Sequence, residues 1–154
     1  MTPDLRELYQ ETIIDHGRHP RNFGELITAN HHHEGFNPLC GDKITLHVET
    51  KEDVIHKIMF EGAGCAISIA SASLMTEILI NKSFNEIEAI FAAFHELVTQ
   101  GNINETLSDS LGKLMVLGGV ADFPARVKCA TLAWHTLKAI LNNQEGVVST
   151  ENTK

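Results

Sequence analysis

The amino-acid sequence predicts an α+β fold, in which a small antiparallel β-sheet of about three strands packs against about five helices. Apolar and polar residues alternate over 44–50, and a short polar turn leads to a second strand-like stretch at 54–62, which together predict a hairpin with one buried face. On both sides of this hairpin, apolar residues recur at helical spacing. A chain of 154 residues is long enough to bury one core.

The segment before the hairpin predicts one helix followed by a loop. Thr2 and Pro3 are typical of a helix cap and a first helical position. The helical apolar spacing that follows ends near Gly17. Residues 17–42 are rich in Gly, Pro, Asn and His and indicate mainly a loop, with a short strand around residues 26–30.

The segment after the hairpin predicts several helices. Residues 66–82 are small and apolar, which suits a buried helix. Ser83 and Glu86 match a capping box for a helix over roughly 84–99. A further helical stretch is expected over 107–120, where a pair of glycines ends it.

Pro124 is expected to start the last helix, which continues with apolar residues at helical spacing. The residues after it are polar, so a disordered tail is expected over 143–154. No linker interrupts the rest of the sequence, and we expect residues 1–142 to form a single domain.

The charge balance excludes several classes of partner. Twelve basic against twenty acidic side chains give a net charge of -8. Binding to nucleic acid needs clustered Lys and Arg, and anionic membrane surfaces repel an acidic protein. The apolar runs are shorter than a bilayer span, and the N-terminal residues include no signal-peptide apolar region. We therefore expect a cytoplasmic protein with no nucleic-acid or membrane partner.

The three cysteines are the candidate site residues. Each lies at the edge of a predicted element: Cys40 before the hairpin, Cys65 between strand and helix, and Cys129 early in the last helix. Asp42 lies two residues after Cys40, and such positions project to the same side of an extended segment. Three sulfurs and one carboxylate suit tetrahedral zinc, and the same thiolates suit a [2Fe–2S] cluster. Reasoning from the residues also leaves open a structural zinc, or buried cysteines with no ligand role.

Two of the cysteines are expected to favour the thiolate, which is the form that binds metal and attacks sulfur. Cys65 precedes a predicted helix, whose positive N-terminal end stabilises an anion. Cys129 follows Arg126 by three residues, which is the same helical face, and adjoins Lys128.

Read with their flanks, these segments resemble the U-type iron–sulfur cluster assembly scaffold family, which includes IscU-like, SufU-like and NifU N-terminal-like proteins. The resemblance extends over about residues 3–142. It rests on the stretches N-P-L-C-G-D, F-E-G-A-G-C-A-I-S-I-A-S and F-P-A-R-V-K-C-A-T-L-A-W, in this order. The SufU-like branch is the more similar one, because the spacer between the second and third cysteines is long and Lys128 stands where IscU-like proteins carry His.

The resemblance implies a Zn²⁺ site formed by Cys40, Asp42, Cys65 and Cys129. It also implies acceptance of persulfide sulfur from a PLP-dependent, SufS-like cysteine desulfurase, with Cys129 as acceptor and Arg126 supporting its thiolate or the partner contact. Such a chain is a sulfurtransferase-like partner of the desulfurase rather than a stand-alone enzyme, and other Suf assembly proteins are further expected partners. The alternative is a scaffold for transient [2Fe–2S] assembly and transfer, with Cys40, Cys65 and Cys129 as cluster ligands.

The histidines are expected to be structural or solvated. His31, His32 and His33 form a triplet that is expected in a solvated loop, where it binds divalent metal only adventitiously. His16 and His19 are expected to fix the end of the first helix and the loop that follows.

Overall fold

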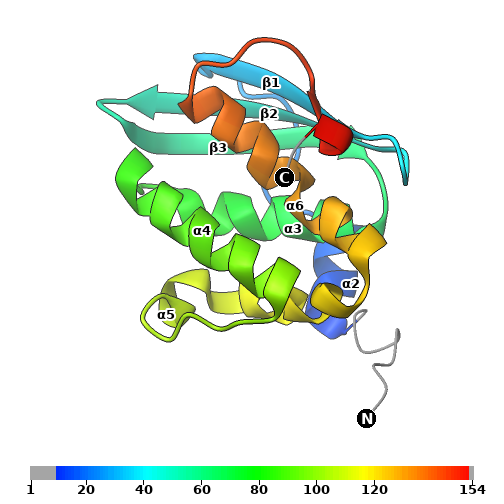
Figure 1. Cartoon of the computed structure of the whole chain (residues 1–154). Helices are drawn as coiled ribbons and strands as arrows, with labels where there is room; N and C mark the ends of the chain where they lie inside the picture. The colour runs from blue at the N-terminus through cyan, green and yellow to red at the C-terminus, as the bar shows by residue number, and fades with distance from the viewer. Residues whose placement is uncertain (1–9, 153–154) are drawn as a thin grey trace.

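A four-stranded sheet with helices against one face forms the fold of residues 10–152, which are the residues that this computed structural model describes (Figure 1). The strand order is β3-β2-β1-β4. Three strands pair antiparallel, and the fourth runs parallel to β1. The strands are β1 (His31–Asn37), β2 (Asp42–Lys51), β3 (Val54–Ala63) and β4 (Val148–Ser149). The predicted α+β class is confirmed, with a mixed sheet of one more strand than expected.

Helices α3 (Ala66–Leu79) and α6 (Pro124–Leu141) lie directly on the sheet. Helix α2 (Glu11–Arg18) packs against α3, while α4 (Phe84–Gln100) packs against α6 on the side away from the strands. The short helix α5 (Ser108–Leu111) and the 3₁₀ helix η1 (Gly112–Asp122) complete this outer layer. The opposite face of the sheet has no helix against it in the described part of the chain.

The predicted hairpin face is part of the core. Ile44, Leu46 and Val48 on β2 are fully buried, as the alternating pattern indicated. The core between sheet and helices is mostly aliphatic, and α3 supplies many small residues that let it pack closely on its neighbours.

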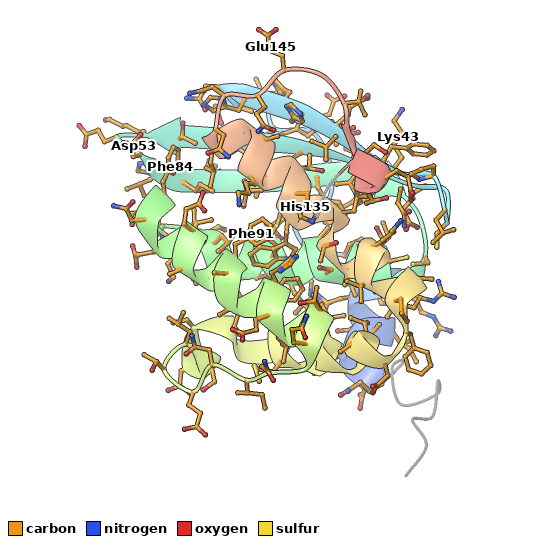
Figure 2. The ribbon with its side chains drawn as sticks, viewed as in Figure 1. Lys43, Asp53, Phe84, Phe91, His135 and Glu145 are labelled. Carbon is orange, nitrogen blue, oxygen red and sulfur yellow. The ribbon has the colours of Figure 1, made fainter. Side chains whose placement is uncertain are left out.

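The middle of α6 is held by aromatic packing and hydrogen bonds. The Trp134 ring stacks on Phe94 of α4 with 4.7 Å between centroids, and its Nε1–H donates to Ser71 Oγ at 3.2 Å. Ser71 Oγ in turn donates to the carbonyl of Ala130 at 2.6 Å. Phe91 of α4 and His135 of α6, labelled in Figure 2, also contact one another edge to face, with 5.5 Å between their ring centroids.

Gly35 allows α6 to approach the sheet closely. A Cβ atom on Gly35 would collide with Thr136 Oγ1 and would lie 3.1 Å from Leu132 Cδ1, both on α6. Only a residue without a side chain fits between β1 and this helix.

Several predicted boundaries are confirmed. The capping box at α4 is present: Ser83 Oγ accepts from the Glu86 N–H at 3.2 Å, and Glu86 Oε1 accepts from the Ser83 N–H at 3.0 Å. Helix α6 begins at Pro124 as expected. Helix α2 ends at Arg18, next to the predicted Gly17, whereas Thr2 and Pro3 lie outside the described residues.

The region before the hairpin differs from its prediction. Residues 26–30 form turns instead of a strand, and the strand begins at the His triplet, which was expected in a solvated loop. Pairing with β2 overrides the weak strand propensity of the sequence H-H-H-E-G.

The helix expected over 107–120 is also different. It is one turn of α-helix followed by η1, whose buried residues Leu114, Leu117 and Val120 are three apart. That spacing matches the three residues per turn of a 3₁₀ helix better than the 3.6 residues per turn of an α-helix.

The residues after α6 do not match the expected disordered tail. The chain returns to the sheet, where Val148 pairs with Gly35 and Ser149 with Phe36, and a 3₁₀ turn, η2 (Thr150–Asn152), follows. Residues 153–154 lie outside the described part.

Among the helices described, none combines the length and apolar content needed to cross a bilayer.

Candidate metal centre

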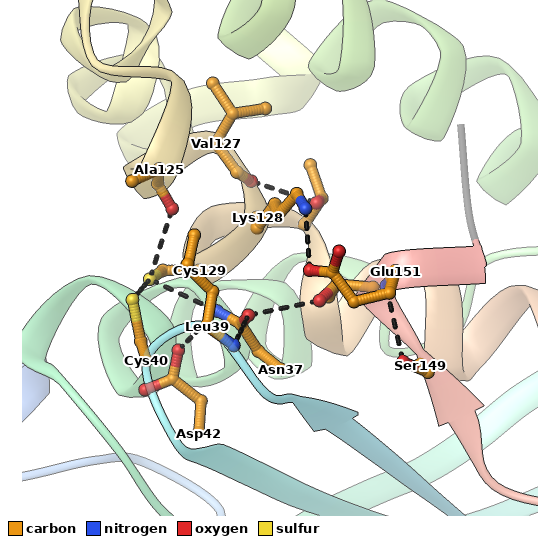
Figure 3. A network of polar contacts seen from close by, with 12 residues as sticks. Asn37, Leu39, Cys40, Asp42, Ala125, Val127, Lys128, Cys129, Ser149 and Glu151 are labelled. Carbon is orange, nitrogen blue, oxygen red and sulfur yellow. Dashed lines mark hydrogen bonds and ion pairs between the residues drawn. The ribbon is translucent and has the colours of Figure 1, made fainter.

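Three segments that are far apart in the sequence meet at one end of the sheet, and Figure 3 shows two of them, with Cys40 and Asp42 facing Cys129. The turn between β1 and β2 carries Cys40, and Asp42 is the first residue of β2. Cys65 is the N-cap residue of α3, directly after β3. Cys129 lies in the second turn of α6, which packs on β1 and β2. The end of the sheet therefore gathers all three cysteines that the sequence singled out.

The ligand atoms of Cys40, Asp42 and Cys129 all lie within 4.8 Å of one another. The sulfurs of Cys40 and Cys129 are 3.4 Å apart, against roughly 3.8 Å between two sulfurs on one tetrahedral zinc with bonds of ~2.3 Å. Asp42 and Cys129 are fully buried, while Cys40 is exposed. The group is thus closed on one side and open to solvent on the other.

Cys65 lies beside this group, but its sulfur is not among the ligand atoms that all lie within 4.8 Å of one another. Its backbone N–H donates to Asp42 Oδ1 at 2.9 Å, and its half-buried thiol is near enough to Cys129 for the two groups to shift one another's pKa. The glycine before it makes the approach possible, because a Cβ on Gly64 would lie 2.5 Å from Asp42 Oδ1. The G-A-G-C motif therefore brings the start of α3 against the carboxylate.

Asn37 is a site residue that the analysis of the sequence missed. Its fully buried amide nitrogen donates to Asp42 Oδ2 at 3.0 Å and lies 3.5 Å from Cys129 Sγ. Its carbonyl oxygen accepts from the Leu39 N–H at 3.2 Å and from Thr150 Oγ1 at 3.1 Å. The signal was its place in N-P-L-C-G-D, three residues before the first cysteine.

The residues after β4 reach the same network. Besides Thr150, Glu151 Oε1 accepts from Lys128 Nζ at 2.7 Å, next to Cys129. Figure 3 shows the contact between Lys128 and Glu151. We call residues 148–151 the C-terminal strap, because they tie the start of α6 to the end of β1. Arg126 is half-buried in the first turn of α6, three residues before Cys129.

The electrostatics differ between two of the thiols. The pKa of Cys65 is lowered to about 7, first by its hydrogen bond with Cys129 and further by the N–H groups of Ser68 and Ile67, against the effect of burial. The pKa of Cys129 is raised by the hydrogen bond with Cys65, by burial and by the charges of Cys65 and Asp42. The lowered pKa of Cys65 has the direction that was expected for a thiolate at the start of α3. The raised pKa of Cys129 is opposite to the direction expected for a thiolate there, and Lys128, one of the two cations expected to favour it, is paired with Glu151.

This donor set fits a metal cation. Several acidic groups share a small, largely buried space, and they repel one another when ionised together. A cation between them removes this repulsion, and sulfur with carboxylate oxygen is a ligand combination that zinc accepts.

The histidines of the first helix have structural contacts. His16 is buried, and its Nδ1 lies 2.7 Å from Ser73 Oγ, which joins α2 to α3. Burial lowers the pKa of His16. The expected structural role is therefore confirmed for His16.

Comparison with known proteins gives a family match over nearly the whole chain. Residues 8–141 match the NifU-like N terminal domain. A protein of Streptococcus pyogenes serotype M1 named iron-sulfur cluster assembly scaffold protein IscU is 44% identical over 139 residues, covering 87% of this chain and 82% of that protein. The zinc-dependent sulfurtransferase SufU of Bacillus subtilis strain 168 is 36% identical over 148 residues, covering 93% and 95%.

The solved structures agree. A crystal structure described as an iron–sulfur cluster assembly scaffold protein for the SUF system, from Fervidobacterium islandicum AW-1, superposes with a TM-score of 0.80 at 32% identity. The superposed region covers 88% of this chain and 97% of the Fervidobacterium chain.

Proposed function

This chain belongs to the NifU-like N-terminal domain family, which includes proteins named IscU and SufU, and on that basis we propose that it accepts persulfide sulfur from a cysteine desulfurase for iron–sulfur cluster assembly, in a zinc-dependent manner. The observation that carries the proposal is the convergence of Cys40, Asp42 and Cys129 within 4.8 Å. Sulfur transfer needs thiols close enough to exchange a sulfur atom, and zinc needs the same groups as ligands.

Cys40, Asp42, Cys65 and Cys129 would hold the zinc. When bound, zinc keeps the thiols as thiolates and protects them from oxidation. Asn37 orients the Asp42 carboxylate through its hydrogen bond, as outer partners of metal ligands commonly do.

The exposure of the thiols supports an order of sulfur transfer. Cys129, the acceptor that the family resemblance implies, is fully buried, whereas Cys40 is exposed with its sulfur 3.4 Å away. In the first step, the Cys40 thiolate attacks the outer sulfur of the desulfurase persulfide, a new S–S bond forms, and the desulfurase thiolate leaves. In the second step, the Cys129 thiolate attacks the outer sulfur on Cys40, and the Cys40 thiolate leaves. Neither step needs an oxidant.

Partner contact falls to the exposed side of the site. Arg126 is our candidate for supporting the acceptor thiolate or the desulfurase contact, because it is one helical turn from Cys129. A PLP-dependent, SufS-like desulfurase is the proposed sulfur donor, with other Suf assembly proteins downstream. We place this chemistry in the cytoplasm, where a reducing environment keeps three cysteines as thiols.

The test is transfer of ³⁵S from labelled cysteine through the desulfurase to this protein. Cys40→Ser is expected to abolish labelling, and Cys129→Ser is expected to stop the label at Cys40, which mass mapping locates. Cys65→Ser is the matched control, since it also removes a zinc ligand but no proposed acceptor. Undiminished labelling of both Cys40→Ser and Cys129→Ser would reject the proposal.

The second candidate is a scaffold for a transient [2Fe–2S] cluster, which the IscU relatives favour by name. The same three thiols suit cluster iron. Anaerobic reconstitution followed by visible absorption tests it: a stable cluster near one per chain favours the scaffold, and absence of cluster absorption rejects it.

A further inference from the structure

A second cluster of metal-binding side chains lies on the face of the sheet that none of the helices within residues 10–152 covers. His32 of β1 and His47 of β2 are directly opposite one another in the antiparallel pair. Their Nδ1 atoms are 2.6 Å apart. On the far side of His47, its Nε2 lies 2.7 Å from Glu61 Oε1 on β3. Three neighbouring strands thus contribute one side chain each.

The contact with Glu61 decides which nitrogen of His47 is available. A carboxylate accepts a hydrogen bond, so Nε2 of His47 carries the proton and donates it to Glu61. In neutral His47 the lone pair is then on Nδ1, and it points at His32. A carboxylate behind a histidine is also the usual outer partner of a metal-bound imidazole, because it fixes the tautomer and the ring orientation.

Burial adds to this orientation. His47 is only 8% exposed, so its ring is held in place by the sheet around it. His32 is exposed and free to adjust. One rigid ligand and one adjustable ligand therefore meet at the surface, where water reaches the remaining positions of an ion.

We propose that His32 and His47 form a second metal site, which binds a divalent transition cation such as Zn²⁺, Ni²⁺ or Cu²⁺ through their Nδ1 atoms, with Glu61 as the outer partner of His47. Imidazole suits these ions, whereas Mg²⁺ and Ca²⁺ prefer oxygen ligands. The ion takes the position of the proton that the two Nδ1 atoms share. His32, an exposed residue, then carries its proton on Nε2.

The geometry needs only a small adjustment. Two nitrogens on one tetrahedral zinc with bonds of ~2.05 Å are roughly 3.3 Å apart. The present 2.6 Å has to widen by about 0.7 Å, within the reach of a rotation of the exposed His32 side chain. The site shares no residue with the thiol centre, so its loading is independent of the sulfur chemistry proposed above.

The experiment uses the full chain after loading with one equivalent of Zn²⁺. Ni²⁺ is then added in equilibrium dialysis, and bound nickel is counted by mass spectrometry of the metal. One nickel per chain is expected, and X-ray absorption at the nickel edge should show imidazole ligands and no sulfur. His32→Ala should lose this nickel, and its exposure keeps the fold intact. Glu61→Gln should retain the nickel with affinity lowered by about 10- to 100-fold.

His31→Ala is the matched control, since it belongs to the same triplet but pairs with Val48 on the helix-covered face. It should bind nickel like the parent protein. Equal losses in His31→Ala and His32→Ala would mean chelation by the triplet as a peptide and would overturn the proposal. Unchanged nickel in His32→Ala, or sulfur ligands at the nickel edge, would overturn it as well. Zinc retained at the thiol centre is measured in the same samples. A loss of zinc from that centre is thereby distinguished from a loss of nickel at the His32–His47 site.

Discussion

The N-terminal end and the middle of α6 show how one helix contributes both chemistry and stability. Its N-terminal end carries Cys129, which is surrounded by polar groups from the β1–β2 turn and the C-terminal strap. Its middle carries Trp134, which packs against α4 and donates to Ser71. The N-terminal end lies among acidic groups that repel one another, and the middle contributes apolar burial. The site can therefore hold acidic groups that repel one another, because packing around Trp134 fixes the same helix several residues away.

The largest effect on stability is expected from Trp134→Ala. Truncating a buried tryptophan should lower the free energy of unfolding by about 3–5 kcal/mol, because a large cavity forms and Ser71 loses a partner. Chemical denaturation of the zinc-free protein measures it, with Trp134→Phe as the milder control. Zinc stoichiometry of the folded fraction should stay unchanged. A loss of zinc binding in folded protein would mean that the N-terminal end of α6 depends on the packing of its middle.

Cys129→Ser should show the opposite behaviour. We expect zinc affinity to fall by more than about 100-fold, beyond the loss typical of an outer partner, while the zinc-free protein is destabilised by only about 1 kcal/mol. Competition with a chromophoric chelator measures the affinity. Comparable zinc affinity in Cys129→Ser and the parent would contradict the assignment of Cys129 as a ligand.

Acid should act on the middle of α6 through His135. Burial lowers the pKa of His135 to about 4, from 6.5, so the unfolded chain binds more protons between these values. This contribution to stability is present above pH 6.5 and is lost as pH falls toward 4, by at most about 3 kcal/mol. Urea titrations of the zinc-free protein across this window, with His135→Gln as control, measure it. An equally steep decline in His135→Gln would assign the effect to other groups, such as His16.

The smallest effect is expected in the C-terminal strap. Thr150→Val keeps the shape but removes the hydrogen bond to Asn37, which in turn contacts Asp42 and Cys129. Zinc affinity should fall by less than about 10-fold, since direct outer partners are worth about 10- to 100-fold. Thr45→Val on the helix-free face of the sheet is the matched control. A loss as large as that of Cys129→Ser would make the strap part of the centre itself.

Local patterns predicted the elements whose causes are local. The capping box at Ser83 and the proline that starts α6 are readable because each acts within one turn. The alternation over 44–50 predicted the buried face of β2 for the same reason. The cysteines and Asp42 were singled out by residue type and motif, and the fold brings Cys40, Asp42 and Cys129 together, with Cys65 beside them.

Features that depend on distant pairing were not predictable in this way. The strand at the His triplet exists because β2 pairs with it, and β4 exists because β1 has a free edge near Gly35. Asn37 has an ordinary surface-type side chain, and its role depends on partners from the strap and α6. The pairing of His32 with His47 likewise depends on the strand register.

The close approach at Gly35 sets a dimension of the whole centre. This residue has no functional group, yet it determines how far α6 stands from β1, and the two nearest sulfurs belong to α6 and to the turn after β1. A single methyl group at Gly35 would push α6 away from β1, and we expect this to increase the distance between the two sulfurs although the methyl group contacts neither. The distance between the two thiols therefore depends on a residue without a functional group, two residues before Asn37, the first polar residue of the network.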